Sequence, residues 1–196
     1  MIQQLADIVR TPAVNFIAAQ AGWFACVLSA ARDMPVLGAS IALAIIAAHL
    51  LGSVSAQREG RLLACAALVG LLFDSALVYA GVLRYGSGMV VDGMAPYWIV
   101  IMWPLFATTL NSSLRWLHGR WLLAAVFGAV FAPLAYAAGG RLGAVDIIAM
   151  PPAMAMLALG WGVLLPLLVW FAQRHDGMRQ ARVVDDVAVV RVARHV

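Results

Sequence analysis

The chain has 196 residues, of which 64% are hydrophobic and only 11% are charged, and its formal net charge is +4. So few charged residues cannot cover the surface of a soluble domain, which excludes that class of protein. The positive charge does not indicate nucleic-acid binding either, because the arginines are divided among short linkers and the tail instead of gathering on one face.

Six apolar runs follow one another along the chain. A helix needs about 20 apolar residues to cross the ~30 Å hydrocarbon core of a bilayer, and each run has roughly that length. The sequence therefore predicts an all-α integral membrane bundle of six transmembrane helices at residues 1–171, followed by a cytoplasmic tail rich in Arg and Val at 172–196. The predicted spans are 13–31, 35–52, 62–83, 96–114, 121–138 and 150–171.

The arginines predict how these helices are oriented, because positive residues favour the cytoplasmic side of a membrane. Most of them lie before the first run, in the second and fourth linkers, and after the sixth run. Only Arg32, Arg84 and Arg141 lie in the remaining linkers. Both termini are therefore predicted to be cytoplasmic, as an even number of crossings requires.

Asp74 is the only acidic residue well inside a predicted span. It lies about 18 Å along the third helix at the usual rise per residue, which places it near the middle of the bilayer. A charge at that depth costs roughly 2.5–3.5 kcal/mol on insertion scales, so we expect Asp74 to face other helices. It is either a structural acid that ties helices together or a proton or substrate site. Candidate hydrogen-bond donors at a similar depth are Trp23, Ser40, Trp103 and Trp161.

A second group of polar residues lies nearer the cytoplasmic side. Three of them, Thr108, Asn111 and Arg115, share one face of the fourth helix. The group could form a substrate-binding pocket for a headgroup or a small anion, or it could supply hydrogen bonds between helices, as such residues commonly do. The candidate binding residues are Asn15, Gln20, Trp103, Thr108, Asn111, Arg115 and Trp161.

Asp74 and His49 are the candidate catalytic residues, because each can exchange a proton. His49 is the only histidine inside a predicted span, but its depth differs from that of Asp74 by about 14 Å. Two residues so far apart do not make a set of metal ligands. The two cysteines form no CxxC motif. The sequence therefore predicts no metal site and no cofactor.

The third and fifth runs share a weak pattern. Both lead outward from the cytoplasm, so a true repeat would be a duplicated helix hairpin of parallel orientation. Chance resemblance is the alternative in a chain this rich in Ala and Gly. The matching residues are Gly70, Phe73, Tyr79, Arg84 and Gly86 in one run and Gly128, Phe131, Tyr136, Arg141 and Gly143 in the other.

Five segments taken together resemble a known family. They are NFIAAQAGWFACVL at 15–28, LFDSAL at 72–77, the stretch from PYW to WPLFATTLNSSLRWL at 96–117, APLAYAAG at 132–139 and GW at 160–161. In residues 14–171 the chain is similar to a bacterial family of small inner-membrane proteins with a domain of unknown function. This resemblance implies a multi-pass protein of the bacterial inner membrane, with no established activity or site residues to carry over.

Members of the family are often encoded beside cyclopropane-fatty-acid-synthase-like methyltransferases and flavin oxidoreductases. The resemblance thus implies a role in modifying or handling membrane acyl chains. The leading hypothesis is an accessory protein or an enzyme of lipid modification, with the lipid headgroup near Asn111 and Arg115 and with Asp74 as a buried anchor or proton donor.

Two alternatives stay open. One is a small proton-coupled transporter in which Asp74 is the titrating group. The other is a structural or assembly partner of another membrane protein. Membrane lipid is the expected ligand, a membrane protein or a second copy of this chain is a candidate partner, and no nucleic acid is expected.

Overall fold

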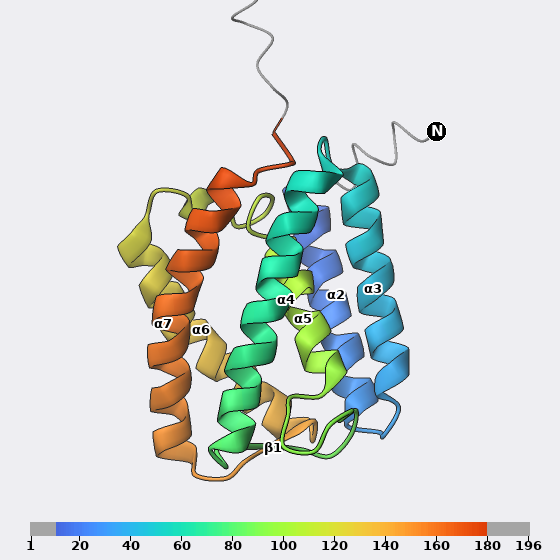
Figure 1. The fold of residues 1–196 in the computed structure, drawn as a ribbon, viewed down its shortest axis with the longest axis vertical. Helices are drawn as coiled ribbons and strands as arrows, with labels where there is room; N and C mark the ends of the chain where they lie inside the picture. Colours follow the sequence, from blue (N-terminus) through green and yellow to red (C-terminus); the bar gives the residue numbers. More distant parts are fainter. Residues whose placement is uncertain (1–10, 180–196) are drawn as a thin grey trace, which may run out of the picture.

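The computed structural model describes residues 11–179. In this part of the chain six α-helices form a single bundle, which confirms the predicted all-α fold (Figure 1). Five of them are long and apolar enough to cross a membrane. The helices are α2 (Pro12–Ala30), α3 (Pro35–Gly52), α4 (Ala56–Tyr79), α5 (Tyr97–Ala107), α6 (Trp121–Arg141) and α7 (Met150–Arg174).

The predicted boundaries differ from the observed ones at both ends of the bundle. The predicted cytoplasmic tail at 172–196 begins inside α7, which continues to Arg174. The rest of that tail from residue 180, and Arg10 at the other end, lie outside the described residues. The orientation of the two termini therefore stays a prediction.

The fourth predicted span, 96–114, is not one continuous helix. Its helical part, α5, has only 11 residues, and turns follow from Thr108 before a short 3-10 helix, η1, at Arg115–Leu117. The hydroxyls of Thr108 and Thr109 donate to backbone carbonyls three residues earlier, at 2.7 and 2.6 Å. Local bonds of this kind compete with regular helix, which explains why the helix ends where the run becomes polar.

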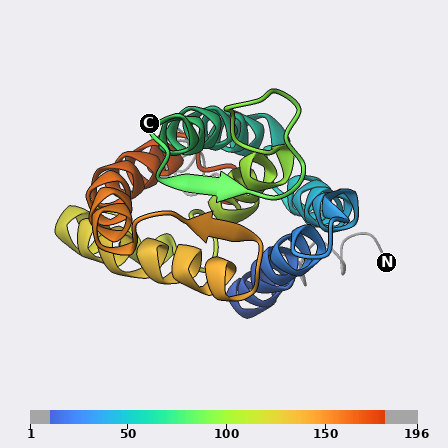
Figure 2. The same cartoon turned by 90° about the horizontal axis from the view of Figure 1, so that it is seen from below.

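α5 lies inside a ring made by the other five helices (Figure 2). It packs on α2, α3 and α4, and none of its residues is exposed. Around the ring, α2 packs closely on α3 and α6 on α7, whereas α2 and α6 are not a closely packed pair in the described part of the chain. The apolar core is therefore centred on α5, and the ring is loosest between α2 and α6.

A two-stranded antiparallel sheet lies across one end of the bundle, where Figure 2 shows its two arrows side by side. Strand β1 (Leu83–Tyr85) follows α4, and β2 (Val145–Ile147) follows α6, with Arg84 opposite Asp146. The sheet was not predicted, because three-residue strands are too short to give an alternating pattern. It holds the ends of α4 and α6 together.

The α4–β1 and α6–β2 segments are equivalent units that run in the same direction (Figure 1). Both helices are followed by a glycine in the left-handed region, Gly81 at φ +68° and Gly143 at φ +87°. This conformation is the usual end of a helix and favours glycine. Because Arg84 also lies opposite its own equivalent, Asp146, the paired strands are related by an approximate twofold axis.

The predicted repeat thus matched the correct helices in the correct relative orientation, but in the wrong register. It paired Gly86 with Gly143, whereas the helix caps pair Gly81 with Gly143. Of Gly81 and Gly86, only Gly81 has the positive φ that the helix cap requires, so Gly81 is the residue equivalent to Gly143. The same spacing of 62 residues separates Asp74 from Tyr136, which are therefore equivalent residues of the two units.

Candidate functional site

Asp74 is fully buried, and both of its carboxylate oxygens accept hydrogen bonds. The hydroxyl of Tyr136 donates to Oδ1 at 2.6 Å, and that of Tyr85 donates to the same oxygen at 3.3 Å. The indole Nε1 of Trp103 donates to Oδ2 at 2.7 Å. These donors come from α6, β1 and α5, so one carboxylate joins four elements of the bundle. We call Asp74 and these three partners the Asp74 cluster.

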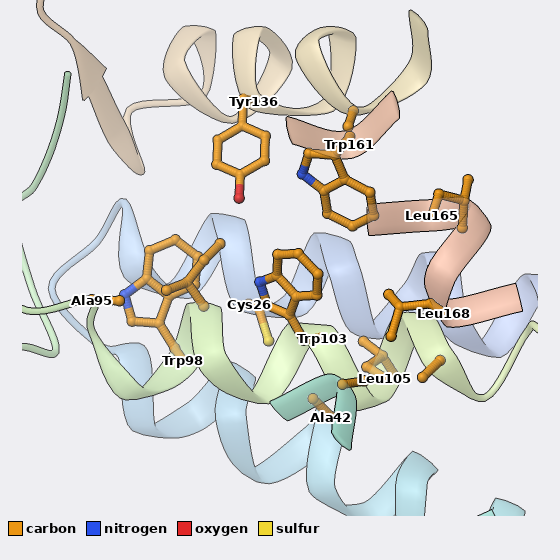
Figure 3. Packing of buried hydrophobic residues seen from close by; sticks show 14 of the residues in the cluster. Cys26, Ala42, Ala95, Trp98, Trp103, Leu105, Tyr136, Trp161, Leu165 and Leu168 are labelled. Carbon is orange, nitrogen blue, oxygen red and sulfur yellow. The ribbon is translucent and has the colours of Figure 1, made fainter. Parts of the chain in front are cut away.

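Close packing fixes the indole of Trp103 in this cluster. Gly70 lies one turn before Asp74 on α4, and a Cβ atom there would overlap the Trp103 ring. Phe73 meets Trp103 edge-to-face with ring centroids 6.0 Å apart. Trp161 stacks on its face at 4.5 Å with an interplanar angle of 18° (Figure 3). The N–H of Trp103 is thereby directed at the carboxylate.

Tyr85 reaches the cluster from the sheet at the end of the bundle. Its ring meets Trp98 edge-to-face, with centroids 5.5 Å apart. Burial, and after it the charge of Asp74, raise the pKa of Tyr85 well above its ordinary value. The phenol therefore stays protonated and available as a donor.

A cavity of about 560 Å³ lies beside the Asp74 cluster, between α2, α5, α6 and α7. Its size is in the range of ~300–1,000 Å³ that is usual for small-molecule sites. Its walls are mainly aliphatic and aromatic. Tyr85, Trp103 and Tyr136 of the Asp74 cluster line it together with Trp161, and Gln20 and Thr109 are further polar residues of the lining. On α6 the lining extends over residues 127–139, or about 18 Å at the usual helical rise. The cavity is therefore long and mainly apolar, and it meets the Asp74 cluster in its wall.

This cavity has a mouth on the side of the bundle. Four of its lining residues are also half exposed on the outer surface: Phe16 (50%) and Phe24 (48%) on α2, and Phe131 (53%) and Leu134 (59%) on α6. They flank the gap where α2 and α6 are not closely packed. In a membrane this surface faces the hydrocarbon, so the mouth opens toward lipid chains.

Glu59, in the first turn of α4, is a second fully buried acid. His49 Nε2 lies 3.0 Å from its Oε2. The amide of Asn111 donates to Oε1 at 2.7 Å, and the backbone N–H of Gly177 donates to the same oxygen at 2.9 Å. We call these four residues the Glu59 cluster. It joins α3, α4, the turns after α5 and the chain beyond α7.

The last described residues, 175–179, form a strap across this end of the bundle. The carbonyl of Gly177 accepts a hydrogen bond from the Ser55 N–H at 2.9 Å. Asp176 pairs with both terminal nitrogens of Arg115, at 2.7 and 2.9 Å. Arg115 also donates to the Asn111 carbonyl. The strap is thereby fastened to the Glu59 cluster.

The structure separates the two candidate catalytic residues. Asp74 belongs to the cluster at the cavity, whereas His49 contacts Glu59 near the strap. Of the predicted donors to Asp74, only Trp103 makes the hydrogen bond, and Trp161 stacks on the Trp103 ring. Trp23 only lines the cavity, and Ser40 is exposed. The predicted partnership of Ser40 with Asp74 is wrong, because Ser40 faces away from the bundle.

The candidate binding residues nearer the strap are also divided. Asn111 donates to Glu59 and Arg115 pairs with Asp176 of the strap, so the side chains of both residues are already bonded to protein groups. Asn15 bonds to the Thr108 carbonyl at 3.3 Å and to the Ser113 hydroxyl at 2.8 Å. Gln20 lines the cavity instead. The group does not form one pocket, and its non-local bonds tie α2, α4 and the strap to the turns after α5.

Three residues that contribute side chains to these clusters were not predicted as site residues. Tyr136 carried a usable signal, because a phenol inside a predicted span needs a partner in hydrocarbon. Tyr85 carried none, because it lies in a linker. Glu59 precedes the predicted start of the third span at residue 62 and lies between Arg58 and Arg61, a pattern typical of a solvated helix end. In residues 11–179, no three His, Cys, Asp or Glu side chains gather to hold a metal ion.

Five membrane-length apolar helices around an apolar core that also buries two polar clusters define a multi-pass integral membrane protein of the all-α class. Within that class, the chain belongs to the family described as "Protein of unknown function (DUF2878)", whose model matches residues 12–167. This confirms the expected membership in a family with a domain of unknown function. No curated protein and no solved structure matches the chain.

Proposed function

We propose that this protein takes a membrane lipid into the cavity between α2 and α6 and handles or modifies it there, either as an enzyme or as an accessory to one. The observation that carries the proposal is the long apolar cavity that opens toward the hydrocarbon and meets the Asp74 cluster in its wall. An apolar chain fits the walls, and the polar end of the same molecule fits the hydroxyl and indole groups.

In this proposal Asp74 acts through its partners. The carboxylate is not itself part of the cavity lining, whereas Tyr136 and Trp103 are. Tyr136 is the group that meets the lipid, and Asp74 orients its hydroxyl and accepts its proton in any acid–base step. His49 takes no part, because it belongs to the Glu59 cluster.

The protein would reside in a bacterial inner membrane, with the strap on the cytoplasmic side. The distribution of arginine supports this orientation. The loops and helix ends near the strap carry Arg58, Arg61, Arg115, Arg120, Arg174 and Arg179. The opposite end carries Arg32, Arg84 and Arg141.

Filling the cavity tests the proposal directly. Ala135→Phe places a ring on the cavity lining of α6, and Val130→Phe places the same ring on the outer face of that helix, away from the lining. Both variants and the parent are purified in mild detergent, and the lipid extracted per mole of protein is measured by mass spectrometry. We expect Ala135→Phe to lose most of the bound lipid and Val130→Phe to keep it. Equal lipid content in all three proteins would contradict the proposal.

A proton-coupled transporter is the second candidate, favoured by one observation. Asp74 is a carboxylate held well inside a span by exchangeable hydroxyl donors, an arrangement that recurs in proton relays. Transport would appear as solute flux in proteoliposomes that Asp74→Asn abolishes. Asp74→Asn leaves the cavity itself unchanged. Lipid retention that survives in this variant would therefore separate the lipid site from the transporter.

A further inference from the structure

Trp161 presents a buried hydrogen-bond donor that the described residues do not satisfy. Trp161 is only 9% exposed, it lines the cavity, and its Nε1 makes no hydrogen bond of ordinary geometry to the described residues; its one polar neighbour among them is the Tyr136 hydroxyl, which already donates to Asp74. Figure 3 shows this nitrogen on the side of the ring that faces Tyr136. A buried N–H without an acceptor costs about 1–3 kcal/mol, so its position at a cavity wall points to a ligand.

The two stacked indoles differ in the acceptor that each of them meets. Trp103 and Trp161 stack on each other from the helices that follow β1 and β2. Trp103 donates to Asp74 at 2.7 Å, but the residue equivalent to Asp74 in the other unit is Tyr136. The Tyr136 hydroxyl donates its own proton to Asp74. The second indole therefore lacks the carboxylate that the first one has.

The charges around the cavity limit what its ligand can be. None of the described residues that line it is Arg or His, so no cationic group would balance a phosphate or a carboxylate headgroup. Asp74 lies directly behind the wall, and a second negative charge in this low-dielectric site would be repelled. An ammonium group is disfavoured as well, because the unsatisfied group is a donor and the Asp74 oxygens already accept three hydrogen bonds.

We infer that the ligand is an uncharged lipid whose polar end is a carbonyl or hydroxyl oxygen, and that this oxygen accepts a hydrogen bond from Trp161 Nε1. Acyl esters and long-chain alcohols have this chemistry. Free fatty acids in the ionised form, alkylamines and intact phospholipid headgroups do not. The inference rests on the proposed function and narrows its ligand to one chemical class.

A series of ligands with one alkyl chain and different ends tests this assignment. Deuterium-labelled alkane, alcohol, methyl ester, carboxylate and amine are each added to the full-length protein in detergent, and the amount retained after gel filtration is measured by mass spectrometry. We expect the ester and the alcohol to bind about tenfold more tightly than the alkane, the difference that about one hydrogen bond makes. We expect the carboxylate and the amine to bind no better than the alkane.

Trp161→Phe keeps an aromatic ring and removes the N–H, so the ester and the alcohol should fall to the affinity of the alkane. Trp121→Phe removes an indole N–H from an exposed position outside the cavity lining and should leave the order unchanged. If Trp161→Phe does not fold, benzothienylalanine at position 161 removes the N–H and keeps the shape of the side chain. The same loss is expected.

The outcomes separate this inference from the proposed function. Tightest binding of the carboxylate or the amine, or an ester preference that survives the loss of the Trp161 N–H, would overturn the inference and leave the lipid site in place. Failure of every ligand in the series to bind the parent protein would overturn both.

Discussion

The hydroxyl of Tyr136 and the carboxylate of Asp74 meet at 2.6 Å from equivalent positions of the two helix–strand units. The bond therefore crosses the approximate twofold axis and ties one unit to the other. Because both residues are buried, neither can replace the bond with water. The stability of the bundle should depend on it.

Tyr136→Phe should destabilise the protein by about 1–3 kcal/mol, because Asp74 loses its shortest donor inside the bundle. Tyr79→Phe is the matched control, since Tyr79 is 89% exposed and its hydroxyl supports nothing in the core. Denaturant unfolding in detergent measures both. Equal losses in the two variants would mean that the bond contributes no specific stability.

Gly70→Ala should cost about 1–3 kcal/mol, because the new Cβ overlaps the Trp103 ring and forces the indole away from Asp74. Gly60→Ala is on the same helix, and its new Cβ would meet no neighbouring element of the described bundle within 4 Å, so it should stabilise the protein by up to about 1 kcal/mol through helix propensity. Opposite shifts in the unfolding midpoint check the pair. A gain at Gly70 would contradict the packing described for Trp103.

Glu59→Leu should release the strap at residues 175–179. Leucine has no acceptor, so the Asn111 amide and the Gly177 N–H lose the oxygen to which both donate, at about 1.5–3 kcal/mol for each bond to a charged group. Limited proteolysis of the C-terminal region measures the release. Asp92→Asn alters an exposed acid and should leave the cleavage rate unchanged.

His118 should make the protein less stable in mild acid. Its Nε2 lies 2.9 Å from the Leu110 carbonyl, and burial lowers the pKa of His118 below its ordinary value of about 6.5. The unfolded chain then binds more protons than the folded one. The stability that the neutral His118 contributes is therefore complete above the ordinary pKa and is lost as the pH falls below that pKa. His118→Gln should lose less stability than the parent between about pH 7.5 and pH 5.5. Identical pH profiles would exclude this role.

The sequence predicted the five long helices of the bundle well, because hydrocarbon imposes a minimum length and a nearly charge-free composition on each of them. It also predicted that Asp74 turns inward, since a carboxylate cannot face lipid without a large cost. Depth alone gave Trp103 as one of four candidate donors, but it could not tell which of them makes the bond. For each of these features, the physical reason can be read from one residue or one apolar run of the sequence.

The partners that depend on the turns and the sheet could not be predicted. Tyr85 reaches Asp74 only because β1 folds back across the end of the bundle. Glu59 is buried only because the strap and Asn111 close over it, and its neighbours Arg58 and Arg61 favoured an exposed end. The cavity depends on a missing contact between α2 and α6, and no residue type marks an absent contact.

The shortness of α5 has a consequence for how the protein is made. A helix of 11 residues is about 17 Å long, well short of the hydrocarbon thickness of ~30 Å, so the translocon cannot release it into lipid as an independent span. The peptide groups of the turns beyond Ala107 would meet lipid with too few partners. We expect this segment to settle into place only after its neighbours have been inserted around it, so that the closing of the outer helices over it is a late step of biogenesis.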